Sequence, residues 1–393
     1  MMRSAPVLIA GGGIGGLAAA LALARRGIPA CVLERRKEFS EAGAGIQIGP
    51  NGVHALRRLG ADAALAASVG RPDAIVVHDG HSGRKLARLP LGDWIEARHG
   101  APYWVAHRRD LQAALLARVG QEPLIEVRTG FEASQFSASG TTVTLHSSSG
   151  DAMHGAALIA ADGLHSSLRA QLVDSPQLRF SGKTATRTVL DSAAVANLLD
   201  TRATGVWLAP EAHVVHYPVR AGREVAMVVI IADDWQAEDW AAPADAGELL
   251  RRLDRFAPPL QQALRRADDW RRWSLYDAEP LASWTRGRVT LLGDAAHPVL
   301  PFLAQGGSMA LEDAVTLADC LAEGADDIER ALERYERKRL LRTARTSRAS
   351  RRNGQIFHLS GVAAAVRNAM LRSLPGRRVM AGYDWLYGWG CEG

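Results

Sequence analysis

The sequence predicts an α/β fold: a Rossmann-like dinucleotide-binding domain interleaved with a β-sheet domain that holds the substrate, followed by C-terminal helices. Three observations support this prediction. A glycine-rich turn joins an apolar strand to a helix near the N-terminus, acid–glycine turns follow two later strands, and the middle of the chain is rich in strand patterns. The 393 residues are sufficient for such a composite fold.

The N-terminal motif joins a short strand to a helix. An apolar run at residues 7–10 leads into a GxGxxG pattern, an alanine- and leucine-rich segment extends to Gly27, and residues 30–33 are again apolar. The first glycine permits a tight turn, the second admits a pyrophosphate, and the last lets the helix pack close to the strand. The glycines that we assign to dinucleotide binding are Gly11, Gly13, Gly15 and Gly16.

An acidic residue closes the second strand of this motif. Glu34 lies 34 − 16 = 18 residues after the last glycine, where a carboxylate can accept a hydrogen bond from a ribose hydroxyl. The helix N-terminus offers free N–H groups and a partial positive charge to the phosphates. A bare GxGxxG also fits a purely structural turn, but strand, helix, C-terminal glycine and acid together favour a bound dinucleotide.

Composition argues against several other classes of protein. Hydrophobic residues make up 47% and charged residues 23%, as in an ordinary globular protein, and the net charge of +5 is too small and dispersed to indicate nucleic-acid binding. No apolar run approaches the ~20 residues that span a bilayer, so we expect no stable membrane association. Cys31, Cys320 and Cys391 lack metal-ligand spacing, so we expect no metal site and a reducing, cytoplasmic location.

Hydrophobic periodicity predicts the elements between the motifs. Residues 74–89 alternate as a β-hairpin, Asp110 lies in the first turn of a helix, residues 164–172 are predicted to be helical, and another helix runs from about Ser308 to Glu323. The central strands are predicted at residues 187–191, 205–208, 213–219 and 224–231.

The C-terminal part is rich in arginine and then in aromatic residues. We interpret the charged helical face at residues 329–352 as solvated surface, and the aromatic tail at residues 383–389 as core or interface packing. The predicted domains are a discontinuous dinucleotide-binding domain (1–70, 100–175 and 285–325), a β-sheet domain (71–99 and 176–284) and a C-terminal helical region (326–393).

Two acid–glycine turns follow later strands. The first fits DGxxSxxR and begins with Asp162. The second contains Asp294 and is followed by Pro301 and then by Gln305, Gly306 and Gly307.

With these motifs, and with the HRxDL segment at residues 107–111, the sequence resembles the class A flavoprotein aromatic hydroxylases. This group contains salicylate hydroxylase, 3-hydroxybenzoate 6-hydroxylase and 6-hydroxynicotinate 3-monooxygenase. The motifs follow the family's order and spacing, and the resemblance covers nearly the whole chain. It implies a p-hydroxybenzoate hydroxylase-like fold, a bound FAD and transient use of NADH or NADPH. It does not decide between the two nucleotides.

The resemblance also assigns residues at the adenosine end of FAD. It implies that Glu34 binds the adenosine ribose and that Arg108 contacts the cofactor, with Arg35 and Gln47 as further candidates. The alternative role of Arg108 is an ion pair at the start of a helix.

At the flavin end, Asp294 is expected to accept hydrogen bonds from the ribityl hydroxyls. The backbone N–H groups of Gly306 and Gly307 are expected to reach the carbonyl edge of the isoalloxazine ring, beside a helix whose dipole stabilises reduced flavin. Asp162 is assigned to the cofactor or, equally, to a structural cap on the helix that follows it.

The chemistry implied by the resemblance is hydroxylation of a small phenolic or heteroaromatic acid by a flavin C4a-hydroperoxide formed from O₂. This reaction needs a base near the substrate and a dry pocket. Strand alternation places His213 and Tyr217 on one face and His216 on the other. We expect His213 to be the base, because a histidine near its reference pKa of about 6.5 is suited to proton transfer. We expect Tyr217 to orient the substrate; the alternative for His213 is an ordinary strand histidine.

The loop after Asp294 is expected to form the opposite wall. By resemblance, Pro301 shapes the oxygen pocket and Gln305 hydrogen-bonds the substrate, whereas His297 is expected to be structural. Arg187 and Arg220 are both candidates for binding a substrate carboxylate.

Two other functions are compatible with the sequence. One is a flavin oxidoreductase on the same fold that does not hydroxylate, and the other is a flavin-containing redox or partner-binding module whose aromatic tail is the interface. The sequence leaves the oligomeric state open, with a homodimer as one option.

Overall fold

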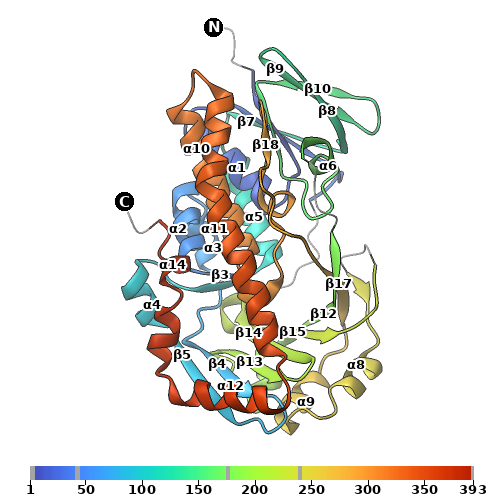
Figure 1. The fold of residues 1–393 in the computed structure, drawn as a ribbon, viewed down its shortest axis with the longest axis vertical. Coiled ribbons are helices and arrows are strands. Elements are labelled where there is room, and N and C mark those ends of the chain that lie inside the picture. The colour runs from blue at the N-terminus through green and yellow to red at the C-terminus, as the bar shows by residue number, and fades with distance from the viewer. Residues whose placement is uncertain (1–4, 40–44, 174–177, 238–240, 391–393) are drawn as a thin grey trace.

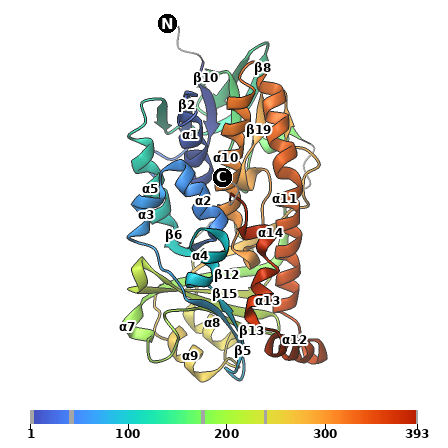
Figure 2. The same cartoon turned by 90° about the vertical axis from the view of Figure 1, so that its left-hand side faces the viewer.

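A computed structural model describes residues 5–39, 45–173, 178–237 and 241–390 (Figure 1). Cys391 and the predicted domain boundary at 175–176 lie outside the described residues. The molecule is elongated, with one large sheet in each half and a long helix, α11 (Ile328–Phe357), running beside both. Figure 2 shows that α11 reaches from one end of the molecule almost to the other.

The first half is built on a six-stranded sheet in the order β18-β19-β11-β1-β2-β7. Five of its strands are parallel, and β18 pairs with β19 in the antiparallel direction. Parallel strands end at the same edge of a sheet, so the turns after β1, β11 and β19 are neighbours. The strands are β1 (Val7–Ala10), β2 (Ala30–Glu34), β7 (Ile125–Thr129), β11 (Ala157–Ala160), β18 (Thr285–Arg286) and β19 (Val289–Leu291).

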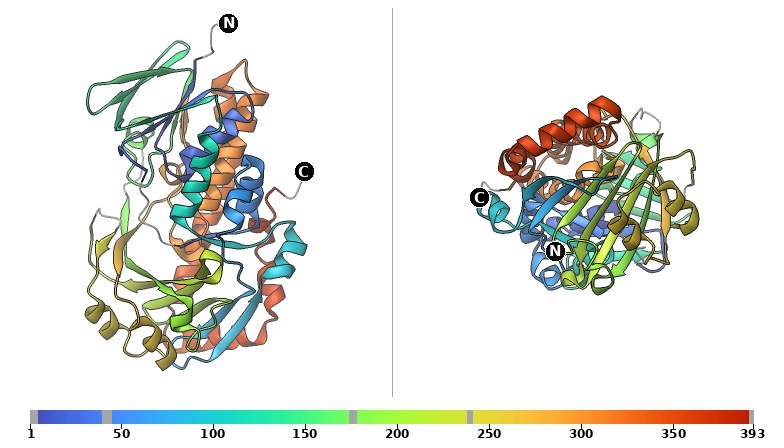
Figure 3. Two further views of the ribbon diagram at one scale, coloured as in Figure 1. Left: turned by 180° about the vertical axis from the view of Figure 1, so that it is seen from behind. Right: turned by 90° about the horizontal axis from the view of Figure 1, so that it is seen from below.

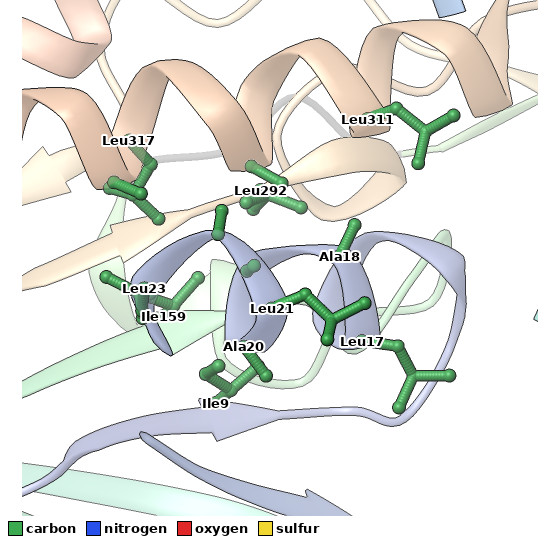
Figure 4. Packing of buried hydrophobic residues seen from close by; sticks show 14 of the residues in the cluster. Ile9, Leu17, Ala18, Ala20, Leu21, Leu23, Ile159, Leu292, Leu311 and Leu317 are labelled. Atoms are coloured by element: carbon green, nitrogen blue, oxygen red, sulfur yellow. The ribbon is translucent and has the colours of Figure 1, made fainter. Parts of the chain in front are cut away.

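Helix α1 (Ile14–Ala24) lies between this sheet and α10 (Gly306–Glu323). Figure 4 shows Ala20 of α1 beside Ile9 of the sheet, with Leu311 and Leu317 of α10 on the other side of the helix. Every α1 residue except Gly15 is buried, which explains its lack of a polar face. The same half contains α2 (Pro50–Leu59), α3 (Asp62–Ala66), α5 (Arg108–Val119) and α6 (Arg169–Leu172).

The second half is built on an eight-stranded mixed sheet in the order β16-β17-β12-β15-β14-β13-β4-β5. Figure 3 shows this sheet from behind, below the parallel sheet. Its strands are β4 (Ala74–Asp79), β5 (Lys85–Pro90), β12 (Arg179–Asp191), β13 (Thr204–Ala209), β14 (Ala212–Val219), β15 (Glu224–Ala232), β16 (Ala242–Pro243) and β17 (Arg271–Asp277).

The remaining elements cover or connect these sheets. Two small sheets are formed by β3 (Gly45–Ile48) with β6 (Trp104–His107), and by β8 (Ala133–Ser139), β9 (Thr142–Ser147) and β10 (Ala152–Gly155). The other helices are α4 (Gly92–His99), α7 (Ser192–Val195), α8 (Ala246–Arg252), α9 (Pro258–Leu264), α12 (Gly361–Ser373), α13 (Gly376–Ala381) and α14 (Asp384–Tyr387), and the 3₁₀ turns are η1 (Arg220–Gly222), η2 (Gly293–Ala295) and η3 (Pro301–Leu303).

The predicted α/β class is confirmed, as are the 74–89 hairpin and the four central strands. The strands of the two large sheets come from within the segments assigned above to the two domains, and the domain boundaries themselves stay a prediction. Strands β8, β10 and β17 were not predicted, because their short polar segments carry little periodicity.

The prediction of a helix over residues 164–172 is wrong for its first half, since only Arg169–Leu172 is helical. The Arg169 guanidinium explains the difference. It donates to the backbone oxygens of Leu164, at 2.7 Å, and of Ala295, at 3.2 Å, so these carbonyls are bound to a side chain. The preceding segment is thereby held as a turn against the loop after β19.

The interpretation of residues 329–352 as solvated surface is also wrong for one face of α11. Arg339 is 1% exposed and forms ion pairs of 2.6 Å with both Glu312 and Asp313 of α10. Arg342 pairs with Glu312 at 2.6 Å. Charged residues are buried here because each one meets an opposite charge on the facing helix, a match between distant segments that periodicity does not show.

Candidate active site

A cavity of about 600 Å³ lies between the two halves of the molecule. It begins at the glycine turn after β1, passes the turns after β11 and β19, and ends against β14. Its lining includes Gly13, Arg108, Asp294 and His213, which come from four separate segments of the chain. One continuous space therefore joins the predicted dinucleotide site to the predicted substrate site.

The glycines of the first turn serve different purposes. A Cβ atom on Gly11, whose φ is +105°, would lie 2.5 Å from the carbonyl oxygen of Ala161. A Cβ on Gly16 would overlap the carbonyl oxygen of Gly11, and one on Gly15 would lie 2.7 Å from Leu292. A Cβ on Gly13, in contrast, would meet nothing within 4 Å. Gly11 and Gly16, whose Cβ atoms would meet backbone, are therefore required by the fold, whereas Gly13 opens a cradle in the cavity wall.

Glu34 braces this turn from the end of β2. One carboxylate oxygen accepts from the backbone N–H of Gly12, at 2.8 Å, and the other from the backbone N–H of Arg36, at 2.9 Å. Arg35 is exposed. Neither Glu34 nor Arg35 is among the residues that line the cavity, so their contacts with an adenosine ribose stay a prediction.

Asp162 holds the turn after β11. Its carboxylate accepts from the backbone N–H of Leu168 at 3.4 Å, one residue before α6, and it caps no residue of that helix, so both roles of Asp162 stay predictions. Burial raises the pKa of this carboxyl group, although hydrogen bonds from Ser166 and Leu168 oppose the shift. Its Oδ1 atom is buried without a hydrogen-bond partner among the described residues. An acceptor is therefore left over beside Gly163, which lines the cavity.

The predicted flavin contacts lie along the same cavity. Asp294, Gly306 and Gly307 line it, as do Arg108, at the start of α5, and Gln47, on β3. The Gln47 side chain accepts a hydrogen bond of 2.6 Å from the hydroxyl of Tyr103. Helices α1 and α10 both begin beside the cavity. Two helix N-termini, an open glycine and an unpartnered carboxylate oxygen fit an extended cofactor with phosphates and ribityl hydroxyls.

One wall of the cavity is a face of β14. His213, Val215 and Tyr217 line the cavity, whereas His216 packs behind the sheet and accepts from the indole N–H of Trp207. This is the predicted alternation. The Tyr217 hydroxyl donates to the backbone oxygen of Gly45 at 3.1 Å, and burial raises the pKa of this hydroxyl. Tyr217 is therefore a neutral, anchored part of the wall.

His213 lies in an unexpected environment. It is 1% exposed, and its Nδ1 atom lies 2.7 Å from Nε2 of His358, the residue directly after α11. Burial, then His358, then Lys183 lower the pKa of His213 well below 6.5. The expectation of a pKa near 6.5 is therefore wrong, because sequence alone does not show how deeply a strand histidine is buried. At neutral pH the two imidazoles form a neutral pair.

Another part of the wall comes from the loop before α10, whose Phe302 lies against His213 with ring centroids 5.6 Å apart. Pro301 and Gln305 both line the cavity, and the Gln305 side chain accepts a hydrogen bond of 2.9 Å from Asn51. His297 does not line the cavity and lies 2.5 Å from Asp313, in agreement with a structural role.

Only one of the two candidate arginines reaches the cavity. Arg187 lines it and stacks on Trp273, with the guanidinium carbon 4.7 Å from the ring centroid. Arg220 lies outside it and pairs with Glu224 at 2.9 Å. The position therefore favours Arg187 as the carboxylate partner.

Several lining residues were not assigned to the site by sequence reasoning. Tyr383 and Tyr387, from the aromatic tail, line the cavity, and Tyr387 contacts Tyr103 with ring centroids 6.1 Å apart. The interpretation of the tail as core packing is confirmed for Tyr387, which is buried. The spacing of the tail aromatics was a visible signal, but only the fold brings them to the cavity. Others of this kind are Tyr103, Trp273, Phe302 and Phe357.

None of the helices in the described residues combines the length and apolar character needed to cross a bilayer.

Comparison with known proteins agrees with this geometry. A family model described as "FAD binding domain" matches residues 4–350. The chain is 40% identical to 3-hydroxybenzoate 6-hydroxylase of Polaromonas naphthalenivorans (strain CJ2), over 98% of this chain and 96% of the relative. It is 32% identical to 6-hydroxynicotinate 3-monooxygenase of Pseudomonas fluorescens, over 90% of this chain and 92% of the relative.

Solved structures share the whole fold. HpxO of Klebsiella pneumoniae, complexed with FAD and uric acid, superimposes with a TM-score of 0.86 at 29% identity, covering 96% of this chain and 95% of that one. A substrate complex of salicylate hydroxylase superimposes with a TM-score of 0.83 at 25% identity, covering 98% of this chain and 96% of that one. The predicted cofactor, FAD, and the predicted enzyme class are thus confirmed. The chain belongs to the FAD binding domain family and, within it, to the FAD-dependent aromatic hydroxylases.

Proposed function

We propose that this enzyme hydroxylates a small phenolic acid and that 3-hydroxybenzoate is its first candidate substrate. The observation that carries the proposal is the end of the cavity, where an apolar strand face with one histidine and one tyrosine lies opposite a proline–glutamine loop. The relative with 40% identity, a 3-hydroxybenzoate 6-hydroxylase, supports this choice of substrate. By analogy with that name, oxygen would be added to the ring carbon para to the hydroxyl.

In this proposal each polar group at the substrate end has one task. Arg187 binds the carboxylate, because it is the arginine on the cavity face of β12. His213 accepts the proton of the ring hydroxyl, and its low pKa rises once an anionic substrate lies beside it. Gln305 hydrogen-bonds the ring oxygen, while Pro301 and Tyr217 shape the pocket. The valines of β13, β14 and β15 keep water out.

The cofactor end is proposed to hold FAD through the residues identified above. Gly13 admits the pyrophosphate at the start of α1, Asp294 accepts from the ribityl hydroxyls, and Gly306 and Gly307 present backbone N–H groups to the ring. Arg108 and Gln47 would contact the cofactor, and Glu34 would bind its adenosine ribose. FAD, once reduced by NADH or NADPH, supplies the oxygen-activating chemistry.

The test is a comparison of isomers. Purified holoenzyme is mixed with NADH or NADPH and with 3-hydroxybenzoate, salicylate, 4-hydroxybenzoate or 6-hydroxynicotinate, and nucleotide oxidation, O₂ uptake and H₂O₂ are measured together. We expect 3-hydroxybenzoate to stimulate nucleotide oxidation most and to gain one oxygen atom per turnover, as read by mass spectrometry. Stimulation that yields only H₂O₂, or a clear preference for another isomer, would overturn the assignment.

We further propose a cytoplasmic homodimer. Three isolated cysteines and the need for reduced nucleotide support the location. An exposed apolar stripe supports a second copy as its partner: Val362, Val366 and Met370 of α12, with Leu374 directly after the helix. Light scattering after size-exclusion chromatography should give twice the mass of one chain for the native protein. The Val366→Asp variant should have the mass of a single chain. A native mass of one chain would contradict the dimer.

A further inference from the structure

Behind the Gln305 wall lies a buried chain of polar side chains. Asn51, in the first turn of α2, is fully buried, and its Nδ2 atom donates both to Gln305 Oε1, at 2.9 Å, and to Glu312 Oε1, at 2.7 Å. Glu312 is also fully buried and is held by Arg339 and Arg342. Asn51 therefore connects a cavity residue to the buried ion pairs between α10 and α11.

The charges fix the orientation of the Asn51 amide. Two arginine guanidiniums donate to the Glu312 carboxylate, at 2.6 Å each, and a carboxylate can only accept hydrogen bonds. Asn51 must therefore turn its NH₂ group, and not its oxygen, toward Glu312. The second hydrogen of that NH₂ group then needs another acceptor, and the Gln305 oxygen is the atom within reach.

The orientation of Gln305 follows from that of Asn51. Because the Gln305 oxygen faces Asn51, its NH₂ group faces away from the buried network. Gln305 is 1% exposed and lines the cavity, and its Nε2 atom has no hydrogen-bond partner among the residues that the structure describes. A buried donor without a partner is costly, so this NH₂ group is set up to meet an acceptor on a ligand.

We propose that Asn51 is a positioning residue that locks the Gln305 amide as a hydrogen-bond donor to the ring oxygen of the substrate. The inference rests on the proposed function, and it specifies which atom of Gln305 acts and what holds it there. A donor aimed at an oxygen that gains negative charge stabilises the deprotonated ring, which is the form that reacts faster. The substrate carboxylate is assigned to Arg187, which leaves the ring oxygen for this amide.

The test measures the affinity of oxidised holoenzyme for 3-hydroxybenzoate and for benzoate, which lacks the ring hydroxyl. Binding is monitored through the change in the visible flavin spectrum. Asn51→Leu should lower the affinity for 3-hydroxybenzoate about tenfold and leave the affinity for benzoate unchanged, because only 3-hydroxybenzoate loses a hydrogen bond. Gln305→Leu should give the same pattern. The double variant should bind no more weakly than Gln305→Leu alone, because both changes remove one interaction.

A second variant keeps the shape of the side chain. Asn51→Asp puts an oxygen in place of the NH₂ group, 2.7 Å from Glu312 Oε1, so the two carboxyl groups should share one proton. No hydrogen is then left for Gln305, which should turn its NH₂ group toward the new carboxyl oxygen and present its own oxygen to the ligand. Binding of 3-hydroxybenzoate should fall at least as far as in Asn51→Leu. The matched control is Asn368→Leu, which removes an amide that donates to Asp79 at 3.0 Å outside the cavity and should leave both affinities unchanged.

The outcomes separate this inference from the proposed function. Equal losses for 3-hydroxybenzoate and benzoate, multiplicative losses in the double variant, or full affinity in Asn51→Leu would each overturn the role of Asn51. If native enzyme does not bind 3-hydroxybenzoate, the proposed substrate is wrong, and the Asn51–Gln305 contact is then judged by melting temperatures of the ligand-free holoenzyme variants. Non-additive shifts support it and additive shifts overturn it.

Discussion

The two ends of the cavity are built from different parts of the protein. At the cofactor end the walls are mainly backbone, in glycine turns at the ends of β1 and β19 and at the start of α10. At the substrate end they are side chains, such as His213, Gln305 and Tyr387, which come from three distant segments. The cofactor end has its shape because glycines leave space where other residues have a Cβ atom. The substrate end has its shape because its side chains are held by hydrogen bonds to residues outside the cavity.

This difference has consequences for mutation. At the cofactor end, substitutions that add atoms to a glycine should disturb the site. At the substrate end, substitutions that remove a hydrogen-bond partner of a wall residue should disturb it. The partners of the substrate wall are polar: the half-buried His358 pairs with His213, and the buried Asn51, with its ion pairs, lies behind Gln305. Buried polar groups are costly to leave unpaired, so residues outside the cavity should matter at this end as much as residues inside it.

The largest effect should come from breaking the ion pairs behind the substrate wall. Arg339→Met leaves Glu312 and Asp313 buried with less compensation, which should lower the free energy of unfolding by about 3–5 kcal/mol. Thermal or urea unfolding of the holoenzyme measures this loss. The matched control on the same helix is Arg330→Met, whose side chain is 83% exposed and should change stability by less than about 0.5 kcal/mol. Similar values for the two variants would contradict a buried network.

Two alanine substitutions in the glycine turn should distinguish a glycine needed for stability from a glycine needed for FAD binding. Gly16→Ala places a methyl group on the carbonyl oxygen of Gly11 and should cost about 3 kcal/mol of stability. The methyl group of Gly13→Ala meets no protein atom, and the residue keeps an allowed φ of −74°. The free energy of unfolding of the apoprotein should therefore be unchanged. Its affinity for FAD should fall roughly 100-fold, or about 2.7 kcal/mol, as measured by fluorescence titration. Normal FAD binding in Gly13→Ala would show that the open space beside this glycine is not the cofactor's.

At the substrate end, His213→Ala should keep FAD but slow hydroxylation of 3-hydroxybenzoate by about 100-fold, or uncouple it toward H₂O₂. Stopped-flow reaction of reduced enzyme with O₂, together with product analysis, measures both effects. His216→Gln, on the other face of the same strand, should leave the ratio of product to H₂O₂ unchanged. Unchanged, coupled turnover in His213→Ala would remove this residue from the mechanism.

The smallest effect concerns pH. Burial, followed by Lys183 and Arg367, lowers the pKa of His358 to about 4, and His213 is shifted in the same direction. A histidine that is neutral when folded stabilises the protein above its unfolded pKa of about 6.5 and loses that contribution as the pH falls toward 4. His358→Gln should therefore reduce the slope of unfolding free energy against pH in this window, by at most about 1.4 kcal/mol per pH unit. An unchanged slope would show that His358 is not buried as a neutral group.

The sequence by itself determined the cofactor end of the molecule. Gly11, Gly13, Gly16 and Asp294 were predicted because a strand, a turn and a helix N-terminus are local features, and parallel strands bring such turns together at one sheet edge. Strand alternation similarly predicted that His213 and Tyr217 share a face.

Only the tertiary structure decided what lies behind the substrate wall. His213 meets His358, 145 positions along the chain, and Asn51 meets Gln305, 254 positions away. The same packing buries Arg339 of a helix that was predicted to be solvated, and it moves the pKa of His213 away from its reference value. Burial and pairing depend on which distant segments come into contact, and a pattern of neighbouring residues carries no information about those contacts.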